Sequence, residues 1–330
     1  MVYLLLIMTK LFKNILYLSE ASVAQGPSIA RAVSIAENNQ ADLTVIDVIP
    51  VITVGIGTLP VGHTFDELQT AMVSDRRKKL EFLVEPYMER ISIQLDVLMG
   101  KTYIEVIHAI LRNKYDLLIK PAENPNFIER MFGSDDMQLL RNCPCPVWLT
   151  RSEKQSDYER ILAAVDVNPD IPDATEQNLN RQILELSSSL AISKFTALDI
   201  VHVWEAPFEM KVRSWSDNPR EAGMAYVEGE RSRHENAINR LGKQLKDQIG
   251  PEAYGHLSPE FHLRRGAPST AIPQTVRQLQ ADLVVMGTVA RTGIAGWLIG
   301  NTAEAILEQL QCSVLAVKPL GFVSPVKLSE

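Results

Sequence analysis

Four short segments in the first half of the chain recur, in the same order, in the second half. The matching pairs are residues 15–20 and 161–166, 42–46 and 199–203, 116–119 and 282–285, and 145–148 and 312–315. Each segment is a nearly continuous apolar run, which is typical of a strand whose sheet is covered by helices on both faces. An internal repeat of this length predicts two copies of one domain.

The stretches between the apolar runs have helical spacing. In one of them, Ala303, Ile306, Leu307 and Leu310 fall on one helical face. Strands that alternate with helices predict right-handed crossovers and a parallel sheet. The expected fold class is therefore α/β, with two tandem doubly wound domains that each hold a five-stranded parallel sheet. A length of 330 residues agrees with this, since single domains usually have roughly 100–200 residues.

A polar segment without periodicity, residues 151–158, separates the two halves and is expected to be a linker. The predicted domains are residues 11–151 and 158–320. The last apolar runs of the two halves, residues 147–150 and 314–317, are expected to lie side by side. Their pairing would cover two sheet edges that otherwise stay exposed.

The overall charge argues against two classes of partner. The formal net charge is −7, so the averaged field would attract neither nucleic acid nor an anionic membrane. The basic run at residues 76–79 lies in a segment with amphipathic spacing and is expected to form the solvent-facing side of a helix. We therefore predict no nucleic acid and no membrane among the partners.

The cysteines and the N-terminus favour the cytoplasm. Cys143, Cys145 and Cys312 are too few for a disulfide framework in a chain of this length. Cys145 and Cys312 occupy the same position of the repeat, which predicts small core residues, and the C-x-C spacing indicates no metal site. Residues 1–8 are apolar but too few for a membrane span, and translation could begin at either Met1 or Met8.

Ligands of an open α/β sheet bind beyond the carboxyl ends of its strands, where the strand order reverses. In the second half, Gly287 follows the fourth apolar run and allows close approach of a ligand to the backbone. Gly300 and Asn301 begin a predicted helix whose free N–H groups suit phosphate. Thr302 and the loop residue Arg291 add further donors.

Asp166 ends the first apolar run of the second half and is expected to lie beside Gly287. There its carboxylate could accept a hydrogen bond from an adenine amino group or a ribose hydroxyl. A glycine after a strand and an asparagine at a helix start also occur in domains with no ligand, so these residues alone leave both interpretations open. His202 lies inside an apolar run and is expected to be a packed strand residue.

Common enzyme motifs are missing from the sequence. It has no complete Walker loop, no Gly-x-Ser-x-Gly and no His-Glu-x-x-His. Gly55 and Gly57 lack the third glycine of a dinucleotide loop and are expected to belong to a flexible connection. An efficient hydrolase or kinase is therefore poorly supported.

The segment from Gly287 onward resembles the universal stress protein family. ATP-binding members of that family carry Gly-x2-Gly-x9-Gly-(Ser/Thr), and this chain has Gly287, Ala290, Gly300 and Asn301 at that spacing. The similarity extends to residues 161–166, and with both halves it spans nearly the whole chain as a tandem-domain type. The methyl group of Ala290 and the exchange of a hydroxyl residue for Asn301 depart from the pattern.

The resemblance implies a fold like that of the adenine nucleotide alpha-hydrolases, with ATP or another adenine nucleotide as the ligand of the second domain. It implies nucleotide contacts from eight residues, namely Asp166, Val203, Gly287, Ala290, Arg291, Gly300, Asn301 and Thr302. Catalytic residues are not implied.

The first half departs further from the family pattern. Pro121 stands where Gly287 stands in the second half, which removes an N–H donor. Asp135 and Asp136 follow Gly133 and Ser134 in the first turn of the predicted helix, where their carboxylates would repel phosphate. We expect no nucleotide in the first domain.

Three functions remain open on the sequence. The first is a non-catalytic cytoplasmic stress-response protein whose second domain binds an adenine nucleotide, with a slow incidental ATPase still allowed. The second is a nucleotide-independent scaffold for a small ligand, a protein partner or self-association. The third is an enzyme of the adenine nucleotide alpha-hydrolase group, for which no base or nucleophile is identifiable.

Overall fold

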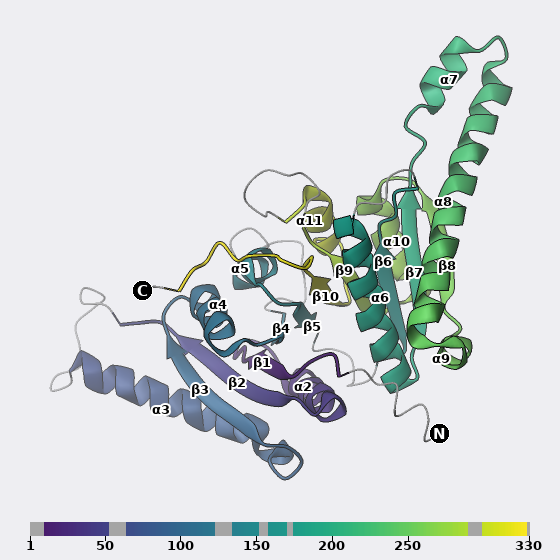
Figure 1. Ribbon diagram of the computed structural model, residues 1–330. Helices are drawn as coiled ribbons and strands as arrows, with labels where there is room; N and C mark the ends of the chain where they lie inside the picture. Colours follow the sequence, from purple (N-terminus) through teal and green to yellow (C-terminus); the bar gives the residue numbers. More distant parts are fainter. Residues whose placement is uncertain are drawn as a thin grey trace.

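The computed structural model describes residues 10–52, 64–122, 134–151, 158–169, 174–289 and 299–328. In the first half, parallel strands lie in the order β3-β2-β1-β4-β5 (Figure 1). They are β1 (Asn14–Leu18), β2 (Asp42–Ile49), β3 (Ile93–Met99), β4 (Leu117–Pro121) and β5 (Val147–Thr150). The apolar runs of the sequence correspond to these strands, because both faces of the sheet are covered.

The second half repeats this arrangement. Its strands are β6 (Arg160–Val165), β7 (Ala197–Trp204), β8 (Glu260–Arg265), β9 (Leu283–Gly287) and β10 (Ser313–Val317). They are parallel and lie in the order β10-β9-β6-β7-β8. The expected α/β fold with two tandem parallel-sheet units is confirmed.

The two halves share one continuous sheet of 10 strands. Strands β5 and β10 pair in antiparallel fashion, with Trp148 opposite Leu315 and Leu149 opposite Val314. The predicted side-by-side contact of the last strands is therefore confirmed. It satisfies the backbone groups of both strands and leaves β3 and β8 as the outer strands of the sheet.

Helices cover the two faces of the sheet in two layers (Figure 1). One layer consists of α2 (Gly26–Asn39), α3 (Phe65–Val84), α6 (Ala174–Lys194), α8 (Pro219–Ile249) and α9 (Pro251–Leu257). The other consists of α4 (Thr102–Asn113), α5 (Asp135–Asn142), α10 (Pro268–Leu279) and α11 (Asn301–Leu307). Each layer encloses an apolar core that runs across both halves of the chain. The basic run at residues 76–79 lies on α3, as expected, although Arg76 forms an ion pair with Asp47.

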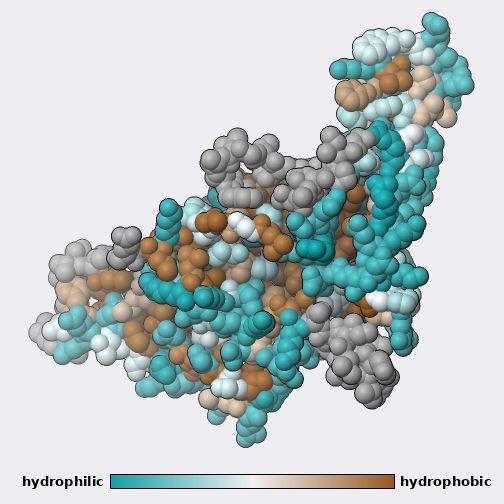
Figure 2. Space-filling model, viewed as in Figure 1, coloured by the Kyte–Doolittle hydropathy of each residue, from teal (hydrophilic) through white to brown (hydrophobic). Residues whose placement is uncertain are grey.

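The helix α7 (Glu209–Trp215) and the first part of α8 form an arm that extends away from the sheet (Figure 1). The two helices approach closely at Gly223, where a Cβ atom would lie 2.5 Å from Nε of Arg213. Met210, Trp215 and Met224 are exposed on the arm, and brown surface is visible near its end (Figure 2).

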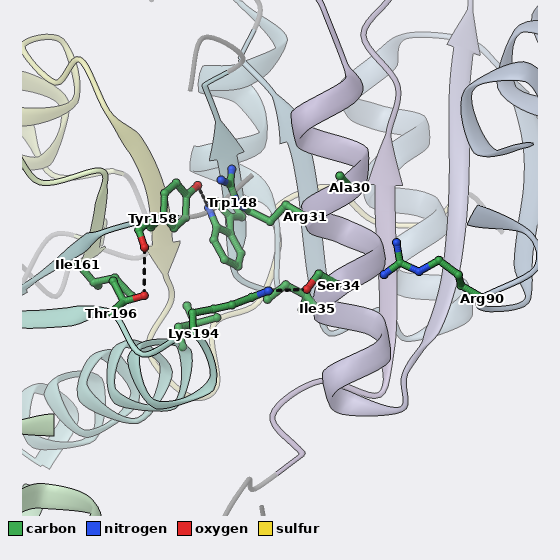
Figure 3. Close-up of a pocket in the computed structure, with 11 residues that line it drawn as sticks. Ala30, Arg31, Ser34, Ile35, Arg90, Trp148, Tyr158, Ile161, Lys194 and Thr196 are labelled. Atoms are coloured by element: carbon green, nitrogen blue, oxygen red, sulfur yellow. Dashed lines mark hydrogen bonds between the residues drawn. The ribbon is translucent and has the colours of Figure 1, made fainter. Parts of the chain in front are cut away.

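A cavity of about 210 Å³ lies where the two domains meet, between α2 and α6 (Figure 3). On its rim Lys194 donates a hydrogen bond of 2.7 Å to Ser34, and the guanidinium of Arg31 lies 3.7 Å from the ring centre of Tyr158. Ile161, at the start of β6, also lines it. The cavity thus lies near the amino end of β6, away from the edge where the sequence predicts a ligand.

Two details differ from or extend the sequence-based expectations. The polar composition of residues 168–177, with Pro169 and Pro172, favours a loop between strand and helix, but α6 begins at Ala174, three residues before the end of that stretch. Cys145 is buried, as predicted, whereas Cys312 is only partly buried. None of the helices within the described residues is long and apolar enough to cross a membrane.

Candidate functional site

The strand order of the second domain reverses between β6 and β9, which are neighbours although they are first and fourth in sequence. Their carboxyl ends, here called the switch-point edge, are where an open α/β sheet binds ligands. Ala164 pairs with Met286, so Asp166 and Gly287 both follow at this edge, as expected. The Asp166 residue is exposed, and its backbone is held by the amide of Asn180 at 2.6 and 3.1 Å.

The start of α11 completes the switch-point edge. Gly300 is the N-cap residue, and its N–H donates to the carbonyl oxygen of Thr288 at 3.0 Å. An isolated antiparallel bridge between Val289 and Ile299 closes the base of the intervening loop. Asn301 and Thr302 are exposed residues of the first turn, where backbone N–H groups have no partner within the helix. The helix has only 7 residues, so an anion would be held mainly by these first-turn donors.

Gly287 has a packing role that the sequence interpretation did not include. A Cβ atom at this position would lie 2.7 Å from Cδ2 of Leu179 in α6. The space expected to admit a ligand beside the glycine is therefore filled by a leucine side chain. The absence of a side chain at Gly287 allows α6 to pack on the sheet, and its backbone angle φ is not in the left-handed region.

Val203 lies near the end of β7 and is buried against the α10 layer. On the opposite face, His202 is 1% exposed, which confirms the expectation of a packed strand residue. Its Nε2 lies 2.8 Å from Nδ1 of His234 in α8, and Trp204 stacks on His234. Burial lowers the pKa of His234, aided by Arg233 and opposed by Asp166. Sequence reasoning missed His234, because only the packing of α8 brings it to β7.

Ala290 and Arg291, two of the predicted contact residues, lie outside the described residues. The structure therefore brings together Asp166, Gly287, Gly300, Asn301 and Thr302 around the switch-point edge, with Val203 on the neighbouring strand.

Lys318, which follows β10, was not identified from the sequence. Its side chain is buried, and its Nζ donates to the hydroxyl of Thr288 at 2.9 Å and to the carbonyl oxygen of Leu140 in α5 at 2.5 Å. Arg141 in α5 also forms an ion pair with Glu304 in α11 at 2.5 Å. Thr288 after β9 and Glu304 in α11 are thus both connected to the first domain.

We expect Lys318 to make stability depend on pH in the alkaline range. Burial lowers its pKa to about 8, opposed by Cys143, whereas an unfolded lysine titrates near 10.4. Between these values the unfolded chain binds more protons, so the free energy of unfolding from this group rises with pH. Between about pH 7.5 and 9.5 the free energy of unfolding of the wild type should therefore rise by about 2 kcal/mol relative to that of Lys318→Met. Urea unfolding of both proteins at each pH measures it, and parallel pH curves would contradict it.

A buried lysine ammonium group lies at the corresponding edge of the first domain. Lys120 in β4 is fully buried, and its Nζ lies 2.7 Å from Oδ1 of Asp136 and 3.2 Å from Oε2 of Glu20. Burial favours the neutral form of Glu20, yet Lys120 and hydrogen bonds from Ser22 hold the pKa of this carboxyl below its usual range. In the repeat Met286 stands at the position of Lys120.

The first turn of α5 has the two carboxylates that the sequence predicted. Ser134 is the N-cap residue and accepts a hydrogen bond from the N–H of Met137 at 3.3 Å. Pro121 ends β4 where Gly287 ends β9. One of these two carboxylates, Asp136, is thus paired with Lys120 from within the domain.

Comparison with known proteins agrees with this repeated architecture. The model of the universal stress protein family matches the chain twice, at residues 11–151 and 157–318. The chain belongs to the universal stress protein family.

Two curated relatives align with this chain over nearly its whole length. The universal stress protein E homolog of Haemophilus influenzae is 27% identical over 317 residues, covering 93% of this chain and 98% of that protein. Universal stress protein E of Photorhabdus laumondii is 26% identical over 325 residues, covering 97% and 99%. A crystal structure of a functionally unknown Pseudomonas aeruginosa PAO1 protein superposes with a TM-score of 0.65 at 24% identity, covering 94% of each chain, and supports the fold.

Proposed function

We propose that this universal stress protein is a non-catalytic cytoplasmic stress-response factor whose second domain binds ATP or a related adenine nucleotide. The phosphates bind at the first turn of α11, through the N–H groups and side chains of Asn301 and Thr302. Asp166 accepts a hydrogen bond from the base or ribose, and Val203 contacts the base. The proposed contacts are completed by Ala290, Arg291, Gly300 and the backbone of Gly287, because Leu179 fills the space on the side of the missing Cβ atom. The observation that carries the proposal is the exposed start of α11 at the switch-point edge.

The contrast between the two domains supports a single nucleotide site. In the second domain α11 begins with the neutral residues Asn301 and Thr302, and the carboxylate of its first turn, Glu304, is paired with Arg141. In the first domain Asp135 and Asp136 begin α5, and Asp136 is paired with Lys120. An anion at the first domain would have to approach two carboxylates and separate an ion pair. We therefore propose that the first domain binds no nucleotide and supports the second through Lys318 and Arg141.

The test is calorimetric titration of the purified full chain with ATP, with Asn301→Asp as the variant. We expect saturable binding by the wild type and at least about tenfold weaker binding by the variant, since a carboxylate would repel the phosphates. An acidic residue at a helix start stabilises the free helix, so lost binding would not reflect lost folding. Mass spectrometry of the protein as isolated would report retained nucleotide.

Ser134→Asp is the matched control, because it adds the same charge at the start of α5 in the first domain. It should leave the affinity for ATP unchanged. Ala290→Gly restores the family pattern and should raise the affinity if the methyl group hinders phosphate. Absence of heat with millimolar ATP in the wild type would reject the nucleotide proposal and favour the scaffold function.

A further inference from the structure

Three side chains able to bind a metal meet at the outer edge of the second domain. Asp199 lies in β7, and Glu260 and His262 lie in β8, the last strand of the sheet. One ligand atom from each residue lies within 4.8 Å of the other two. The cluster lies near the amino ends of these strands, whereas the switch-point edge is formed by the carboxyl ends of the strands.

The strand register places two negative charges next to each other. Asp199 is the direct neighbour of Glu260 on the adjacent strand. Like charges in directly opposite positions destabilise a sheet. His262 follows Glu260 by two residues, so both side chains project from the same face of β8. A cation bound among the three groups would remove the repulsion and use the imidazole nitrogen as a further ligand.

Asp199 is held in position by a neighbouring strand. Its side chain is 1% exposed, and Nη1 of Arg160 in β6 donates to Oδ2 at 2.8 Å. The other oxygen, Oδ1, lies 2.5 Å from Nε2 of His262. Arg160 thus orients the carboxylate from the side of β7 that faces away from β8, as the outer-shell partners of metal ligands do.

We propose that Asp199, Glu260 and His262 bind one divalent transition-metal ion of the zinc class. One imidazole and two carboxylates form a mixed nitrogen and oxygen set, which suits Zn²⁺ or Co²⁺ better than Mg²⁺ or Ca²⁺. The ion takes the place of the hydrogen bond between Nε2 of His262 and Oδ1 of Asp199, and these atoms separate by about 1 Å to reach ligand distances near 2.1 Å. Water fills the fourth position. The bound ion ties the edge strand β8 to β7.

The first domain lacks this set and serves as an internal contrast. Asp42 stands in the repeat at the position of Asp199. The register pairs Leu43 with Ile93, as it pairs Ile200 with Phe261, so Ser92 and Gln94 occupy the positions of Glu260 and His262. A single metal ion per chain is therefore expected.

The test uses the untagged full chain, stripped of metal with a chelator and titrated with Zn²⁺ by calorimetry. One equivalent should bind, and Glu260→Gln and His262→Gln should each weaken binding at least tenfold. The control is His256→Gln, which removes an exposed histidine of α9 and should leave binding unchanged. Glu260 is exposed, so its replacement leaves the fold intact, which circular dichroism checks.

Titration with Co²⁺ identifies the ligands independently. Visible absorption bands without a sulfur charge-transfer band would show nitrogen and oxygen ligands and exclude the Cys143 and Cys145 thiols, whose Sγ atoms lie 3.5 Å apart. No saturable binding, or binding that both variants retain at full strength, would overturn the proposal. Neither result depends on whether the second domain binds nucleotide.

Discussion

Replacing Lys120 by methionine is expected to lower the free energy of unfolding by about 3–5 kcal/mol. The ammonium group is fully buried between Asp136 and Glu20, so the substitution leaves two carboxylates close together without their shared cation. Breaking a buried ion pair costs more than the pair itself contributes, because the remaining charge keeps its desolvation penalty. Urea unfolding followed by circular dichroism measures the loss.

Two further variants separate the charge effect from a packing effect. Lys78→Met removes an exposed lysine from α3 and should change stability by no more than about 0.5 kcal/mol. Combining Lys120→Met with Asp136→Leu and Glu20→Gln should recover most of the loss, since apolar groups of similar volume can replace a buried ion pair. If Lys120→Met alone were as stable as the wild type, Lys120 would not be the counter-ion that these buried carboxylates need.

The positions of most strands along the chain could be predicted from the sequence, because a strand covered on both faces must be apolar along its length. Residues 161–166 and 282–285 identified β6 and β9, and the other repeated runs identified six more strands, but β3, β8 and the order of strands in the sheet came only from the structure. The side-by-side contact of β5 with β10 also followed, since both strands would otherwise be exposed edges, whereas its antiparallel direction was seen only in the structure. Helix starts were less certain, as the early start of α6 shows.

The side chains that define the two switch-point regions could be predicted only in part. Glycine at 287 was assigned to ligand approach, but its immediate neighbour is Leu179, from a different element. Lys120 closes an apolar run and looks like the polar end of a strand, yet its partners come from the end of β1 and the start of α5. The hydrogen bond of Lys318 is made to the carbonyl oxygen of Leu140 in α5, which belongs to the other domain. Such contacts arise from tertiary packing, which local patterns do not encode.

The metal cluster shows the same limit at the outer strand. Glu260 and His262 are close in sequence, but Asp199 reaches them only through the β7–β8 register. A search for spaced ligands along the chain therefore finds no metal motif here.

Trp148→Ala is expected to destabilise both domains together, with a loss of about 3–5 kcal/mol. The indole is 1% exposed in β5, directly opposite Leu315 of β10, and its Nε1 donates to the hydroxyl of Tyr158 at 3.2 Å. Its removal leaves a cavity at the one strand pair that joins the two halves of the sheet. Because the apolar cores run across both halves, the effect should spread to either side.

Hydrogen exchange can show whether the loss is shared. Amides of β1 and of β6 lie on opposite sides of the β5–β10 pair, and both should exchange faster in Trp148→Ala by a similar factor. Trp215→Ala is the control, because that indole is 85% exposed on the arm and its removal should leave the exchange of both strands unchanged. Faster exchange confined to β1 would mean that the domains unfold independently and that the shared sheet does not couple them.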